Sequence, residues 1–126
     1  MRSGKMKIAD LKLTQIYISV AKLKAVESWL GEGDAYDPIC IRKFGSEWLV
    51  LDGHARLLAL ANQGALEVEV EVDRDELSPE LARLYLTCRE WADELSIKDL
   101  NERILNDDDY QKLWIERCRA ELAGAN

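Results

Sequence analysis

Long apolar runs are missing from this sequence of 126 residues. No stretch approaches the ~20 apolar residues that a membrane-spanning helix needs. The basic residues at positions 1–5 also lead into no apolar signal-peptide core. We therefore expect a cytoplasmic protein that is not exported and has no membrane partner.

Cysteine and histidine are scarce: the chain has three cysteines, Cys40, Cys88 and Cys118, and one histidine, His54. No two cysteines form a CxxC pair, and a single histidine cannot complete a local Cys/His metal set. The spacing thus argues against a structural zinc site and against a disulfide framework. Widely spaced thiols of this kind fit reduced core residues in a reducing compartment.

Positive charge is in the minority, because 17 Lys and Arg stand against 24 Asp and Glu, which gives a net charge of −7. An acidic chain repels the phosphate backbone of nucleic acids, so DNA is not an expected partner of this chain alone. A solvated surface is the simpler interpretation of the lysines near the N-terminus, since no aromatic residues are interleaved with them. The alternative is a basic rim that steers a nucleotide, formed by Lys5, Lys7, Lys12, Lys22 and Lys24.

What the sequence does contain is a regular apolar pattern that changes near residue 75. Before that point, the pattern alternates between strand-like and helix-like periods. It predicts a strand at 16–20, a helix that stops at Gly31 and Gly33, a hairpin of residues 39–41 and 48–51, a helix over 57–64 and a strand at 68–72.

After residue 75 the sequence predicts only helices. Ser78 followed by Pro79 begins one, Ser96 with Asp99 resembles a capping box, and the acids at 107–109 favour the start of a last helix. We expect an α+β (mixed α/β) fold. A small mixed sheet with helices would occupy residues 1–74, and a C-terminal helical extension of residues 75–126 would pack on it.

The turn at residues 52–56 carries the strongest chemical signal. A strand that runs into Asp52 and Gly53 and then a helix places unpaired N–H groups at the strand's end, where the helix dipole also favours an anion. Gly53 lets a ligand approach the backbone because it has no Cβ. Arg56 can grip a phosphate with two N–H groups, and His54 can donate a hydrogen bond or transfer a proton.

Each of these side chains also has a purely structural interpretation. Asp52 could be a helix N-cap. A lone histidine such as His54 is more often packed than catalytic, and Arg56 could form an ion pair with Asp52 or with an acid of the C-terminal extension. On the residues alone, an anion site and a structural turn both stay open.

A family resemblance adds to this segment. Residues 38–41, 48–56, 64 and 68–72 together resemble the ParB/sulfiredoxin superfamily, over about residues 13–73. The form Asp-Gly-His-x-Arg is closest to the branch that includes the free-serine kinases, and the helical tail resembles that of small bacterial ParB-like proteins. In that superfamily the Gly-x-x-Arg turn binds nucleotide phosphates. The resemblance therefore implies phosphate contacts from Gly53, His54, Ala55 and Arg56.

The kinase branch also implies a chemistry. It implies ATP or ADP rather than CTP, Mg²⁺ bridging the phosphates, a small hydroxyl-bearing acceptor, and proton transfer assisted by Asp52 or His54. His54 stands where sulfiredoxins have their reactive cysteine, so reduction of sulfinic acid is not implied. Gln15 stands where the kinases and ParB carry a functional acid, and an amide cannot act as a general base. Glu27 and Asp34 are nearby substitutes.

Three classes of function stay open. The first is a nucleotide-binding protein acting as a small-molecule phosphotransferase of the free-serine-kinase type, or as a nucleotide hydrolase. The second is a non-catalytic accessory protein that binds DNA or another partner. The third is an interaction module whose helical tail forms a homodimer. Nucleotide turnover, salt-dependent retention on DNA and light scattering would distinguish them.

Overall fold

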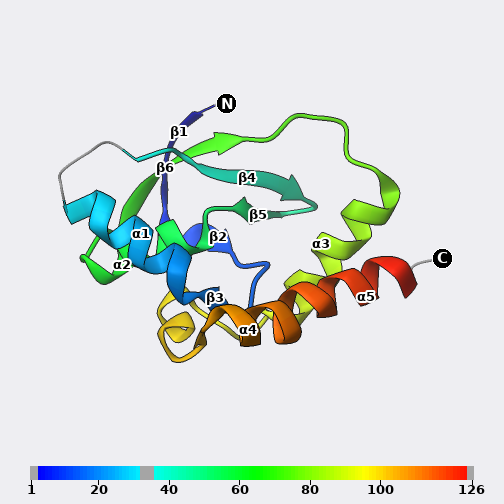
Figure 1. Ribbon diagram of the computed structural model, residues 1–126. Coiled ribbons are helices and arrows are strands. Elements are labelled where there is room, and N and C mark those ends of the chain that lie inside the picture. The colour runs from blue at the N-terminus through cyan, green and yellow to red at the C-terminus, as the bar shows by residue number, and fades with distance from the viewer. Residues whose placement is uncertain (1–2, 32–35, 125–126) are drawn as a thin grey trace.

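The structure is a computed structural model that describes residues 3–31 and 36–124. It contains a five-stranded mixed sheet in the order β1-β6-β4-β5-β2, and the helices α1, α2 and α4 lie below β4 and β6 in the view of Figure 1. The β1–β6 and β4–β5 pairs are antiparallel, whereas β4–β6 and β2–β5 are parallel. The expected α+β fold with a small mixed sheet is therefore confirmed. The strands are β1 (Ser3–Lys7), β2 (Leu11–Lys12), β4 (Ile39–Phe44), β5 (Glu47–Asp52) and β6 (Glu67–Val72).

The predicted hairpin and the predicted alternating strand are both confirmed. β4 and β5 form the hairpin, and in β6 the side chains of Val68 and Val70 are buried while the intervening glutamates face solvent. The prediction for residues 16–20 is only partly right. β3 (Ile18–Ser19) is shorter and pairs in parallel with β7 (Ile104–Leu105) in a separate two-stranded sheet.

Strand β1 was not predicted from the sequence. Its lysines Lys5 and Lys7 lie opposite Glu69 and Glu67 of β6, so cross-strand charge pairing replaces the apolar alternation that marks a strand. The five N-terminal lysines are accordingly divided among β1, β2 and α1 (Val20–Gly31). A solvated lysine surface stays the simpler interpretation of these residues, and the alternative of one basic rim stays a prediction.

The predicted helices are present with adjusted ends, but the prediction of only helices after residue 75 is wrong, because β7 is a strand and the segment after Ser96 is a 3-10 helix. α1 ends at Gly31, and Ser78 caps the N-terminus of α3 by accepting a hydrogen bond from the Leu81 N–H. α4, a π-helical segment η3 and α5 follow one another without a break (Figure 1). The remaining elements are η1 (Ile8–Asp10), α2 (His54–Asn62), α3 (Pro79–Trp91), η2 (Ile97–Glu102), α4 (Asp107–Tyr110), η3 (Gln111–Ile115) and α5 (Glu116–Gly124).

One hydrophobic core joins the two parts of the chain. Ile39 and Val50 of the sheet and Leu57 of α2 are fully buried in a cluster that also contains Leu100 and Trp114 from residues 75–126. The helical extension thus packs on the sheet and α2, and the division into units 1–74 and 75–126 stays a prediction. None of the described helices has the length and apolarity needed to cross a membrane.

Candidate functional site

The N-terminus of α2 follows directly on the end of β5. Gly53, with φ +104° and ψ 21°, is the N-cap residue, and no side chain caps the helix. Asp52 is exposed at the end of the strand. The interpretation of Asp52 as the N-cap is therefore wrong. The first N–H groups of α2 are left without a side-chain acceptor, which is the condition for an anion site.

Gly53 is required here by its surroundings as well as by its φ angle. A Cβ at this position would lie 3.1 Å from Nη1 of Arg56 and 3.1 Å from Cδ1 of Ile39. Only glycine fits between these atoms without displacing one of them. The turn therefore brings backbone, rather than a side chain, to the start of α2.

A pocket of about 310 Å³ lies against this turn. It brings together all five predicted site residues and adds side chains from β3, α1 and α4. Among the lining residues, Lys22 supplies an ammonium group and Asp52 supplies a carboxylate. The lining residues are Gln15, Ile18, Ser19, Lys22, Ala25, Val26, Asp52, Gly53, His54, Ala55, Arg56 and Tyr110.

The His54 imidazole is a buried structural link. It is only 2 % exposed, and its Nε2 accepts a hydrogen bond of 3.0 Å from the Thr14 backbone N–H. Burial lowers the pKa of His54 to about 3, so the ring is neutral at physiological pH. Thr14 in turn donates from Oγ1 to the Val50 carbonyl. The expected proton transfer by His54 does not fit this geometry, because the ring holds the 13–15 segment against β5 and α2.

Arg56 also faces the backbone. Its Nη1 donates to the carbonyls of Asp37 (3.1 Å) and Pro38 (3.2 Å) at the entrance of β4. Its Nε is buried without a hydrogen-bond partner among the described residues. The ion pairs considered for Arg56, with Asp52 or with a C-terminal acid, do not occur within residues 3–31 and 36–124. Arg56 therefore fixes the turn with its side chain and offers the pocket its backbone N–H.

Three residues of the pocket, Gln15, Lys22 and Tyr110, were not among the predicted catalytic or phosphate-binding residues. Gln15 donates from Nε2 to the Tyr17 carbonyl (3.0 Å) and to Oη of Tyr110 (3.1 Å). The ammonium of Lys22 lies 5.9 Å from the centre of the Tyr110 ring. Nothing in the sequence signals the contact of Tyr110 with Gln15, because the two residues are 95 positions apart. The C-terminal extension thus supplies one wall of the pocket.

The acids proposed as substitutes for Gln15 do not join the pocket. Glu27 is exposed on α1 and is not a lining residue. Asp34 lies outside the described residues. Within the described part of the chain there is also no group of three metal-binding side chains. Asp52 is the carboxylate that the pocket offers.

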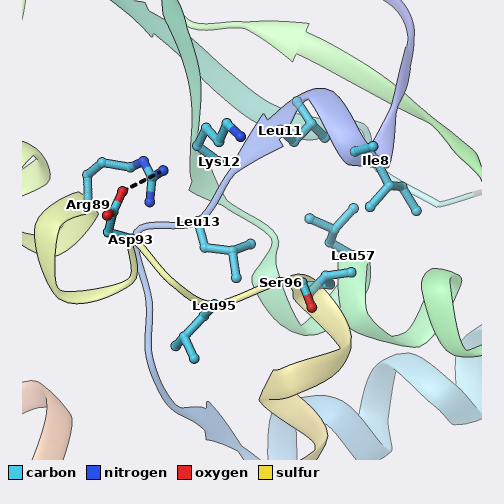
Figure 2. A pocket seen from close by; sticks show the side chains of 11 residues that line it. Ile8, Leu11, Lys12, Leu13, Leu57, Arg89, Asp93, Leu95 and Ser96 are labelled. Atoms are coloured by element: carbon cyan, nitrogen blue, oxygen red, sulfur yellow. Dashed lines mark hydrogen bonds and ion pairs between the residues drawn. The ribbon is translucent and has the colours of Figure 1, made fainter.

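A smaller pocket of about 180 Å³ lies on another face of the molecule. Figure 2 shows its aliphatic walls, among them Leu13 and Leu57, and the ion pair between Arg89 and Asp93 at its rim. Arg89 is 3.4 Å from Asp93 and 3.2 Å from Glu47. Because two carboxylates already neutralise this guanidinium, the pocket is a poorer anion site than the one at α2.

Comparison with known proteins shows which solved structures share this fold. No protein-family model and no curated protein matches the chain. A protein from Agrobacterium tumefaciens matches with a TM-score of 0.57 and 17% identity over 90% of this chain and 65% of that one. Sulfiredoxin from Arabidopsis thaliana matches with a TM-score of 0.54 and 12% identity, over 68% of this chain and 98% of that one.

A free serine kinase variant with glutamine in place of a glutamate, in complex with AMP, matches with a TM-score of 0.51 and 23% identity. The match covers 59% of this chain and 32% of that one, so the chain spans about a third of that kinase's length. At sequence identities this low, a structural match is evidence for the fold alone. The chain has the ParB/sulfiredoxin-like fold.

Proposed function

We propose that the pocket at the N-terminus of α2 binds a nucleotide through its phosphate groups. The observation that carries this proposal is the uncapped start of α2 at Gly53, next to a pocket of about 310 Å³. The backbone N–H groups of His54, Ala55 and Arg56 are the donors for a phosphate, and the helix dipole adds to their attraction. Lys22 adds a positive charge.

The nature of the nucleotide follows from the resemblance. The matched kinase variant is in complex with AMP, which supports an adenine nucleotide, ATP or ADP rather than CTP. Mg²⁺ fits the site only together with the phosphates. The pocket offers Asp52 as its carboxylate, and Mg²⁺ is commonly held by one or two carboxylates plus substrate phosphates.

A negative charge at Ala55 is expected to abolish nucleotide binding without harming the fold. Ala55 lies in the first turn of α2, where an acidic side chain is favoured by the helix dipole but repels a phosphate. In a thermal-shift panel of ATP, ADP, CTP and GTP, with and without Mg²⁺, a ligand at 100 times its Kd stabilises the wild type by about 2.7 kcal/mol. Ala55→Asp is expected to lose this shift.

The matched control is Ala55→Asn, which has the same size and no charge. It is expected to keep most of the nucleotide-dependent shift, because the backbone donors and the charge of the site are unchanged. An equal loss in both variants would mean that bulk at position 55, and not charge, blocks the pocket. Equal shifts in Ala55→Asp and wild type would place the nucleotide elsewhere.

For the chemical step we propose phosphoryl transfer from the nucleotide to a small hydroxyl-bearing acceptor. Asp52 is the pocket's carboxylate and is exposed, so it can accept the acceptor's hydroxyl proton. Gln15 cannot do this, and its amide is already bonded to Tyr17 and Tyr110. We therefore propose that Asp52 acts as the general base in place of the functional acid that the kinases carry near position 15.

Replacing Asp52 with asparagine separates binding from transfer. General-base catalysis contributes about 10²–10⁴-fold, so we expect Asp52→Asn to lose at least 100-fold in phosphate transfer while retaining the nucleotide-dependent thermal shift that is measured without Mg²⁺. The assay follows nucleotide consumption against a panel of small alcohols and hydroxy amino acids. Nucleotide binding by the wild type without any turnover would instead support the non-catalytic accessory protein.

A further inference from the structure

Two cysteines far apart in the sequence meet away from the nucleotide pocket. Cys88 lies in α3 and is 4 % exposed, and Cys118 lies in α5 and is partly buried. The two helices pack against each other, and the two thiols are near enough that each shifts the pKa of the other. Both cysteines are free; Cys88 belongs to the core cluster and Cys118 packs against it.

The surroundings give the two sulfurs different characters. The interaction between the two thiols raises the pKa of Cys88 and lowers the pKa of Cys118. Burial opposes this by raising the pKa of Cys118, and Arg117 adds to the lowering. The guanidinium of Arg117 lies 3.8 Å from the centre of the Trp91 ring, so it is held between α5 and α3. Cys118 is therefore the better nucleophile and Cys88 the buried thiol beside it.

We propose that Cys88 and Cys118 form an oxidisable dithiol that hydroperoxides convert into a disulfide joining α3 to α5. The packing of α5 on α3, with the Arg117 guanidinium over the Trp91 ring, supplies the proximity, and the partial exposure of Cys118 admits a small oxidant. A low-pKa, accessible cysteine beside a second thiol is the arrangement that redox-sensing cysteines use. In a reducing compartment such a disulfide is transient.

The reaction balances in two steps. The Cys118 thiolate attacks the terminal peroxide oxygen, so an S–O bond forms, the O–O bond breaks, and the other oxygen leaves as an alcohol or water after protonation. The product is a sulfenic acid on Cys118. The Cys88 sulfur then attacks this sulfur, so the S–S bond forms, the S–O bond breaks, and water leaves with the Cys88 proton. The two thiols lose two electrons and the peroxide gains them; a thiol reductant reverses the change.

Cys40 provides an internal control within the same chain. It is partly buried in β4, where burial and the charges of Asp73 and Asp52 raise the pKa of its thiol. It has no thiol partner to form a disulfide with, since its only fellow cysteines within the described residues are paired with each other. Cys40 is therefore expected to react slowly and to stay a thiol.

The test treats the full chain with a small excess of hydrogen peroxide and measures the intact mass after alkylation of the remaining thiols. We expect the mass to show the loss of two hydrogens and a single alkylated cysteine, Cys40. We also expect the Tm to rise by several degrees, because the disulfide closes a long loop. Cys40→Ser is expected to form the same disulfide. Cys118→Ser is expected to form none.

The same treatment in urea shows whether the fold creates the reactivity. We expect the disulfide to form at least 10-fold more slowly in the unfolded chain, where the two helices no longer hold the thiols together. Equal rates in both states would overturn the proposal. So would added oxygen on Cys118 without a disulfide, first oxidation at Cys40, or disulfides formed only between two chains on a non-reducing gel.

Discussion

Lowering the pH from 7 to 4.5 is expected to reduce the free energy of unfolding by about 3 kcal/mol through His54 alone. The folded protein holds this ring neutral, with its pKa lowered to about 3, whereas the unfolded chain protonates it near the ordinary value of 6.5. Between these values the unfolded state binds one more proton, so stability falls as the pH falls. The contribution is complete above pH 6.5 and is lost progressively toward pH 3.

His54→Gln isolates this effect. Glutamine does not titrate, and its side-chain oxygen can accept the Thr14 N–H that Nε2 of His54 accepts now. We expect urea denaturation at a series of pH values to give a slope below pH 6.5 that is about 1.4 kcal/mol per pH unit steeper for wild type than for the variant. Parallel curves would show that His54 titrates normally in the folded protein and that the ring is not enclosed.

Replacing Gly53 with alanine is expected to cost about 2–4 kcal/mol of stability and to abolish nucleotide binding. The backbone at φ +104° strains any side chain. The new Cβ would also press on the Arg56 guanidinium and on Ile39, each 3.1 Å away. Since that guanidinium holds the carbonyls of Asp37 and Pro38, the turn would lose its attachment to the start of β4.

Gly64→Ala is the matched control for this prediction. Gly64 follows α2 with φ +92°, and a Cβ there would meet no atom within 4 Å. Gly64→Ala therefore introduces the backbone strain without any crowding, and we expect it to lower the free energy of unfolding by about 1 kcal/mol. It should leave nucleotide binding intact. Both free energies come from urea denaturation. Equal losses for the two variants would mean that the contacts around Gly53 contribute nothing beyond its φ angle.

The elements in which apolar residues recur at a regular spacing were predictable from the sequence. In β6 the valines alternate with glutamates, and the hairpin of β4 and β5 is bounded by turn residues. β1 was missed because Lys5 and Lys7 pair with glutamates instead of being buried. The pairing of β3 with β7 could not be predicted, because β7 lies more than 80 residues away along the chain. Such pairings depend on tertiary contact and leave no local pattern.

The site was predictable at the level of the backbone and less so at the level of side chains. Gly53 at the start of α2 follows from the Asp-Gly sequence between a strand and a helix. The packed interpretation of His54 was available from the sequence, but its bond with Thr14 and the bonds from Arg56 to two carbonyls could not be foreseen, because their partners come from other segments. The same reason hid Tyr110, which the C-terminal helix brings to the pocket.

The central claim is that phosphate binds to the first N–H groups of α2, and an NMR titration tests it directly. In ¹⁵N-labelled protein titrated with ADP, the amide signals of His54, Ala55 and Arg56 should move together and saturate at one Kd, with the pocket residue Lys22 moving in parallel. Ala55→Asp should remove these changes. Saturable changes confined to the residues around Arg89 and Leu95, or no changes at millimolar ADP, would contradict the claim.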